Sequence, residues 1–174
     1  MHIISAIVLP SKKPAITCDP LDKKMILEEE QATQILTQVI VFFNKYPQQC
    51  TAMYRYLTTN YTNALDPSIP ISWCASLRTM EYSINKVLKK STKPIHLATF
   101  QSYQKCISAY TKKFFDIYRR SHWISLVLQT SQGKQVRLET SIAQLNLIKW
   151  ILTYGKVCIA IATKESRNRQ RIRI

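Results

Sequence analysis

Glycine is almost missing from this sequence, and its scarcity restricts both the fold and the function. Gly133 and Gly155 are the only two glycines among 174 residues. Glycine lets the backbone adopt positive φ and lets phosphate groups approach it closely. Glycine-rich nucleotide loops, such as the P-loop and the dinucleotide-binding turn, are therefore excluded. The scarcity also favours helices over folds built from many tight turns.

Acidic residues are scarce too, but only in the second half of the chain. Residues 1–81 carry seven Lys or Arg and seven Asp or Glu, whereas residues 82–174 carry 18 Lys or Arg and three acids. The formal net charge of +15 therefore belongs entirely to the second half. Such an asymmetry costs stability through self-repulsion and is typical of a surface that lies against nucleic acid or an acidic membrane.

No catalytic or metal-binding motif is present, and we expect a protein that is not an enzyme. A two-metal nuclease needs several carboxylates in one cleft, which the three acids of the basic half do not supply without help from Asp66 or Glu81. Cys106 with His96 and His122 is a conceivable ligand set, but the spacing matches no standard zinc pattern. We predict no cofactor and no metal, and a small metal-dependent nuclease is the weakest function hypothesis.

Disulfide patterning and long apolar runs are also missing. The five cysteines are an odd number without a C-x-x-C pair, so we interpret them as reduced core residues of an intracellular protein, in nucleus, cytoplasm or virion. The densest apolar run, VIVFF at 39–43, is much shorter than the roughly 20 residues that a membrane-spanning helix needs. We therefore expect no transmembrane segment.

Helical periodicity dominates residues 1–92. Apolar residues recur every three or four positions between Asp19 and Pro47, and similar patterns predict helices over 48–65 and from about Ser72. The segment IISAIVL at 3–9 predicts a short strand or packed arm. We expect this electroneutral, mostly helical part to serve packing, homo-oligomerisation or docking to a protein partner.

A long basic helix is predicted after Pro94. Apolar and aromatic residues on it alternate steps of three and four and so line one side of a helix of about 24 residues. Core packing is the favoured interpretation, and stacking of nucleic-acid bases on Tyr103 or Tyr110 is the alternative. The stripe consists of Phe100, Tyr103, Ile107, Tyr110, Phe114 and Ile117.

From His122 the apolar pattern alternates, which predicts a β-hairpin with a turn at Gly133. Ser141 and Gln144 form a capping-box pair that starts a helix ending at Gly155, and VCIAIA at 157–162 predicts a strand that joins the hairpin. Residues expected on the inner face of the hairpin are Ile124, Leu126, Leu128, Val136 and Leu138.

The predicted fold class is therefore α+β. It consists of a mostly helical part (1–92), a long basic helix followed by a β-hairpin–helix–strand (ββαβ) unit (93–163), and an arginine-rich tail (164–174). The three stretches are compatible with one compact domain.

Four arginines occupy every second position of the C-terminal segment KESRNRQRIRI. In an extended strand this spacing places all four on one edge, and in a disordered tail it makes a flexible cationic brush. Either arrangement suits a polyanion, while a solubilising tail, another acidic partner or a nuclear-import signal stays open.

The sequence favours a nucleic-acid-binding protein that contacts phosphates of DNA or RNA with little sequence preference. It would act as a packaging or architectural component, or as an accessory factor in replication or transcription, and its AT-rich coding bias fits a virus or an AT-rich microbe. The competing hypothesis is a structural or matrix-like protein whose basic face binds an acidic protein or an anionic membrane. The candidate phosphate-binding residues are Lys86, Lys89, Lys90, Lys93, Lys105, Lys112, Lys113, Arg119, Arg120, Arg137, Arg167, Arg169, Arg171 and Arg173.

Overall fold

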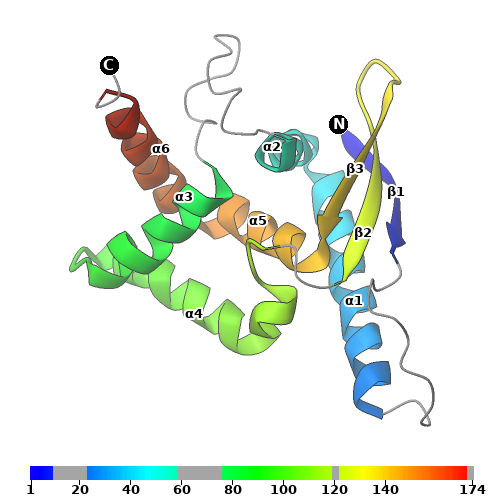
Figure 1. The fold of residues 1–174 in the computed structure, drawn as a ribbon, viewed down its shortest axis with the longest axis horizontal. Coiled ribbons are helices and arrows are strands. Elements are labelled where there is room, and N and C mark those ends of the chain that lie inside the picture. Colours follow the sequence, from blue (N-terminus) through cyan, green and yellow to red (C-terminus); the bar gives the residue numbers. More distant parts are fainter. Residues whose placement is uncertain (10–22, 59–75, 119–121, 172–174) are drawn as a thin grey trace. The chain divides into compact units, whose positions relative to one another are not determined.

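The chain combines helices with one antiparallel sheet, as the predicted α+β class requires (Figure 1). The computed structural model describes residues 1–9, 23–58, 76–118 and 122–171. A π-helical segment, Ser83–Val87, and a 3-10 turn, Leu88–Lys90, lie between the third and fourth α-helices. The remaining elements are β1 (His2–Val8), α1 (Lys23–Lys45), α2 (Pro47–Thr58), α3 (Leu77–Tyr82), α4 (Pro94–Phe114), β2 (Trp123–Gln129), β3 (Gln135–Ser141), α5 (Ile142–Tyr154) and α6 (Lys156–Arg171).

Two compact units divide the chain, and each consists of two separate stretches of sequence. Unit 1 comprises Met1–Cys50 and Lys112–Leu147, and unit 2 comprises Thr51–Thr111 and Ile148–Ile174. The boundary expected at residues 92/93 falls inside unit 2. Unit 1 contains the sheet and α1, whereas the elements of unit 2 are helical throughout its described residues.

The predicted β-hairpin is confirmed, with β2 and β3 in antiparallel register. Leu126 pairs with Leu138, and Leu128 pairs with Val136. The turn closes through the Gly133 amide, which donates to the Thr130 carbonyl over 3.0 Å, and Gly133 has a φ of +79°. A glycine is used here because a side chain would strain that backbone. On the inner face Ile124, Leu126 and Leu128 are fully buried, and Val136 and Leu138 are half-buried.

The third strand of the sheet comes from the N-terminus, which corrects the predicted topology. β1 pairs antiparallel with β2, so the sheet order is β1-β2-β3 and residues 157–162 do not join it. The register shifts between Ile3 and Ser5, where a bulge interrupts the pairing. The segment expected as a strand or packed arm is therefore an edge strand.

A side chain from α1 covers part of this edge. Asn44 accepts a hydrogen bond from the Ile3 amide at 2.7 Å and donates from Nδ2 to the Ile3 carbonyl at 3.0 Å. The side-chain amide of Asn44 thus satisfies the N–H and the carbonyl of Ile3, with which another strand would otherwise pair. The predicted α1 is also confirmed, since its buried residues are Ala32, Ile35, Leu36, Val39 and Phe43.

The start of α5 is fixed by buried polar side chains. Ser141 accepts a hydrogen bond from the Gln144 amide at 3.2 Å, as expected for the N-cap. The Gln144 side chain does not return to Ser141, because it accepts from the Thr140 hydroxyl at 2.8 Å and donates to the Ile117 carbonyl at 2.9 Å. Asn146 likewise donates to the Phe114 carbonyl at 3.0 Å. These amides hold the segment that follows α4 against α5.

Residues 157–162 form the first part of α6, so the predicted final strand is wrong. Gly155 ends α5, and α6 begins at the next residue, with the two helix axes bent by 95°. A Cβ at Gly155 would lie 2.8 Å from the Cα and the carbonyl oxygen of Ile151, so the close turn needs glycine. Cys158 and Ala162, one helical turn apart, are buried in unit 2, where α6 packs on α3. Such packing selects the helix over the β propensity of the segment.

Among the described residues, no single helix is long and apolar enough to span a bilayer. Only the bent pair of Ile142–Tyr154 and Lys156–Lys164 together has the length and composition of a span, and most of Ile142–Tyr154 is buried.

The predicted long helix is shorter and interrupted. α4 ends at Phe114, and Thr111 within it has φ 58° and ψ 171°, a region that residues other than glycine rarely occupy. Phe114 and Ile117 are buried, whereas Tyr103 and Tyr110 are half-buried.

Candidate nucleic-acid interface

The predicted phosphate-binding residues fall into both units. Unit 2 contains 14 Lys or Arg and three acids, a formal charge of +11, and unit 1 contains 11 Lys or Arg and seven acids, a formal charge of +4. The charge difference between the two units is thus smaller than that between residues 1–81 and 82–174, but unit 2 still carries most of the net positive charge.

Four of the predicted lysines surround the connection between α3 and α4, and we call this group the lysine turn. Its members all have exposed side chains. Within the described part of the chain none of them forms an ion pair. The lysine turn consists of Lys86, Lys89, Lys90 and Lys93.

The backbone of the lysine turn is held by a serine and a histidine. Ser91 Oγ accepts a hydrogen bond from the Lys93 amide at 3.3 Å and lies 2.8 Å from His96 Nδ1. Pro94 is the first residue of α4, a position where its missing N–H costs nothing. The turn therefore presents its lysines from a constrained backbone, next to the positive end of the α4 dipole.

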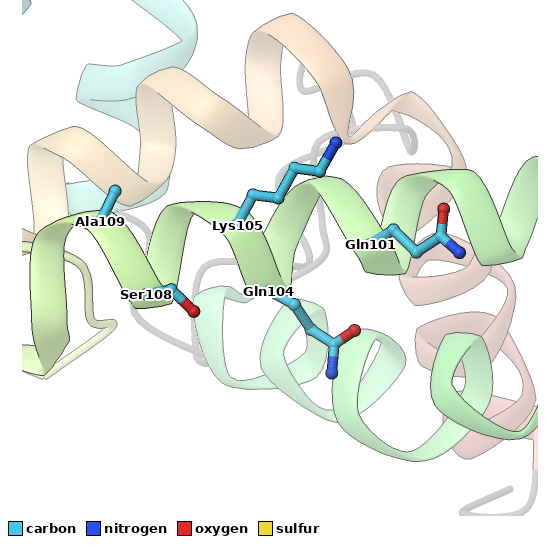
Figure 2. Close-up of a pocket in the computed structure, with 5 residues that line it drawn as sticks. All are labelled: Gln101, Gln104, Lys105, Ser108 and Ala109. Carbon is cyan, nitrogen blue, oxygen red and sulfur yellow. The ribbon is translucent and has the colours of Figure 1, made fainter.

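The exposed side of α4 carries one further predicted lysine. Lys105 is exposed, and beside it lies a shallow, open depression of about 590 Å³. Figure 2 shows its lining, which comes entirely from α4, with Gln104 and Ser108 extending to one side of the helix in this view and Lys105 to the other. Polar, uncharged groups around a lysine offer hydrogen bonds in addition to charge. The lining residues are Gln101, Gln104, Lys105, Ser108 and Ala109.

The aromatic stripe of α4 turns toward α5. The ring centroids of Tyr103 and Trp150 are 5.5 Å apart, and Trp150 Nε1 donates to Ser102 Oγ at 3.1 Å. Phe100 stacks on Tyr103 at 6.4 Å. These contacts favour the packing interpretation over a base-stacking platform.

Unit 1 holds three of the predicted cations within its described residues, and one of them is neutralised. Lys113 Nζ lies 2.7 Å from Glu28 Oε1, an ion pair that joins the end of α4 to α1. Lys112 and Arg137 are exposed. Arg119 and Arg120, expected at the corner before the hairpin, lie outside the described residues, as does Arg173.

The alternating arginines of the C-terminal segment do not lie on an extended strand at their first three positions. α6 continues as a helix to Arg171, so the backbone at Arg167, Arg169 and Arg171 is helical. Alternate positions lie about 200° apart around a helix axis, since each residue advances 100°. The expectation of a single shared edge, and that of a disordered brush, are therefore wrong for residues 164–171.

Two exposed lysines of α6 are not among the phosphate-binding residues predicted from the sequence. Lys156 and Lys164 are exposed and lie eight residues apart on the same helix. The residues between them were predicted to form a strand, so the two lysines were not expected to share a helix. Their spacing, together with Ala160 between them, was the available signal of a helix face.

The ligand set considered for zinc is not assembled. His122 belongs to unit 1, whereas His96 and Cys106 are ten residues apart on α4 in unit 2. Among the described residues, no three His, Cys, Asp or Glu side chains stand close enough to hold a metal ion. Burial raises the pKa of the Cys106 thiol, while the nearby Lys149 lowers it, so the thiol is a poor nucleophile at neutral pH.

His122 has the most unusual surroundings of the three histidines. Its φ is +50°, its ring lies 4.8 Å from that of Phe114, and its buried Nδ1 has no hydrogen-bond partner. Burial lowers its pKa, Glu28 and Glu29 raise it, and Lys113 lowers it further. The side chain is therefore neutral at physiological pH.

The chain belongs to a family of unknown function, DUF7197, whose model matches residues 22–168. No curated protein and no solved structure shows significant similarity to it.

Proposed function

We propose that this protein binds nucleic acid through phosphate contacts, with little dependence on base sequence, and that unit 2 carries the main binding surface. The observation that supports this most directly is the formal charge of +11 on unit 2 together with the exposed lysine turn. Concentrated cations without internal partners destabilise a folded unit, and a polyanion relieves that cost.

The contrast between the two units supports the same proposal. In unit 1 Lys113 is paired with Glu28, whereas the lysine turn has no such partner within the described residues. Internal ion pairs neutralise a basic surface, so their absence leaves the lysine turn available to phosphate. The adjacent start of α4 adds a positive dipole end to the same place.

Phosphates are better suited to this surface than bases are. Lysine is a mobile point charge without the fork geometry that arginine uses to read guanine. Tyr103, one of the two candidates for base stacking, instead contacts Trp150 and Phe100. Phosphate contacts position a protein on nucleic acid without reading sequence, which fits a packaging or accessory role.

A salt titration tests the proposal. We expect retention on random-sequence DNA and RNA to weaken by orders of magnitude between about 50 and 200 mM sodium chloride, because each phosphate contact contributes about 0.9 to the logarithmic salt slope on duplex DNA. The variant Lys89→Gln/Lys90→Gln should lower the slope by about 1.8 and weaken binding about 60-fold at 0.1 M salt.

A control of equal charge separates a local surface from a general charge effect. Lys45→Gln/Lys134→Gln removes two exposed lysines of unit 1 and should leave affinity within about twofold. Equal losses for the two double variants would contradict a binding surface on unit 2. Absence of binding at low salt, together with retention on anionic vesicles, would instead support the matrix-like alternative.

A further inference from the structure

β1 forms one edge of the three-stranded sheet, and its hydrogen bonds show which of its main-chain groups face outward (Figure 1). The Leu9 amide donates to the Trp123 carbonyl at 2.7 Å, so Leu9 directs its main-chain N–H and C=O toward β2. These directions alternate along an antiparallel strand. Ile7 therefore also faces β2, whereas Ala6 and Val8 direct both groups away from it.

The contact with Asn44 agrees with this alternation. The bulge between Ile3 and Ser5 shifts the pattern by one residue, so the main chain of Ile3 should also face outward. It does, since its N–H and C=O are the groups that the Asn44 side chain binds. Asn44 thus closes one end of the edge. The main chain of Ala6 and Val8 has no hydrogen-bond partner in the part of the chain that the structure describes.

The open part of the edge lacks the residues that normally prevent pairing between sheet edges. Natural edge strands carry charged residues or proline, and β3, at the other edge, includes Arg137 and Glu139. Residues 2–9 contain no Lys, Arg, Asp, Glu or Pro. Their aliphatic side chains are exposed instead, with Ile7 at 57% and Val8 at 51%. The edge therefore suits an uncharged, aliphatic strand, and β1 itself is such a strand.

We infer that β1 pairs antiparallel with β1 of a second copy of the chain, across a twofold axis at Ile7. In this register Ala6 of each copy pairs with Val8 of the other, and each pair exchanges two main-chain hydrogen bonds. Ile7 lies opposite Ile7 of the second copy, where two β-branched side chains form a favourable cross-strand contact. The two sheets become one sheet of six strands, three from each copy.

Charge and size set the strength of this dimer. Unit 1, which contains β1, has a formal charge of +4 against +11 for unit 2, so a second copy meets less repulsion at unit 1. The pairing is restricted to residues 5–9, because Asn44 already occupies the main chain of Ile3. Small interfaces are typical of weak complexes. We therefore expect a reversible dimer with a micromolar dissociation constant.

Sedimentation velocity of the full chain, freed of nucleic acid by nuclease treatment, measures the association. Between about 1 and 200 µM protein at about 0.15 M sodium chloride, the wild type should shift from monomer to dimer. Ile7→Lys and Ile7→Glu each place like charges opposite each other at the axis and should raise the dissociation constant at least about tenfold. An equimolar mixture should associate more tightly than either variant alone, because lysine then lies opposite glutamate.

Two further variants separate the strand edge from other exposed surfaces. Val8→Pro removes an N–H that faces the second copy and none that pairs with β2. It should weaken the dimer at least about tenfold while far-UV circular dichroism stays unchanged. Val41→Lys changes an aliphatic residue on α1 that is 61% exposed, in the same unit, and should leave the dissociation constant within about twofold.

Three results would refute the pairing: a wild type that stays monomeric at every concentration, a dimer that Val8→Pro does not weaken, or mixed Ile7 variants that associate no better than each alone. Each of them would leave the proposed function standing, because retention on nucleic acid tests that function separately and its surface is assigned to unit 2. Loss of retention with an intact dimer would refute the proposed function alone.

Discussion

Replacing Gln144 with leucine should destabilise unit 1 more than most single substitutions. The side chain is 7% exposed and connects the Thr140 hydroxyl to the Ile117 carbonyl. Leucine has a similar size but leaves both groups buried without this partner. Each lost group costs about 1–3 kcal/mol, and the apolar side chain returns about 1–2 kcal/mol, so we expect a net loss of about 2–3 kcal/mol.

Urea denaturation of the wild type, Gln144→Leu, Thr140→Val and the double variant measures this loss. The double variant has no hydroxyl left to satisfy, so it should be about 1 kcal/mol more stable than additivity of the two single variants predicts. Additive losses, or a Gln144→Leu variant within about 0.5 kcal/mol of the wild type at an unchanged m value, would refute the argument.

Three further predictions concern other buried groups. Because burial lowers the pKa of His122 below 6.5, the unfolded state binds its proton at higher pH than the folded state. Stability should therefore decline as pH falls through 6.5, and the decline should be smaller in His122→Asn, as followed by unfolding curves from pH 8 to 5. Gly155→Ala should cost about 1–3 kcal/mol in thermal or chemical unfolding, since its Cβ would lie 2.8 Å from main-chain atoms of the preceding turn; an unchanged midpoint would contradict that clash. Burial raises the pKa of Cys50 to about 11 and that of Cys158 to about 12. Both thiols should resist iodoacetamide in the native protein and react in urea, and mass spectrometry of individual peptides would reveal native labelling that contradicts this.

The sequence predicted correctly those elements whose structure is set by residues close to one another along the chain. The hairpin follows from alternating apolar residues on either side of Gly133, where a positive φ is required. The start of α5 follows from Ser141, because capping is a contact over three residues. The apolar face of α1 follows from spacing alone.

Contacts between distant segments explain the errors. The alternation in VCIAIA is compatible with a strand, and only packing of Cys158 and Ala162 within unit 2 selects a helix. β1 takes the place that this segment was expected to fill, because Ile3 pairs with Leu128 across most of the chain. The arginine positions were assigned to the wrong geometry for the same reason, since their arrangement depends on the helix that precedes them. The cluster of lysines in the lysine turn could be predicted from the sequence. That Lys113 belongs to the other structural unit could not.

The interleaved order of the two units affects how the chain is made. During synthesis β1 leaves the ribosome long before Trp123–Gln129, the strand with which it pairs. Unit 1 lacks its second stretch until residue 147 has emerged, and unit 2 lacks its own until the final helix is complete. Unit 2 therefore cannot be complete before unit 1, although its first stretch is made earlier than the second stretch of unit 1. Cutting the chain near its middle should therefore yield two fragments, neither of which contains a complete unit.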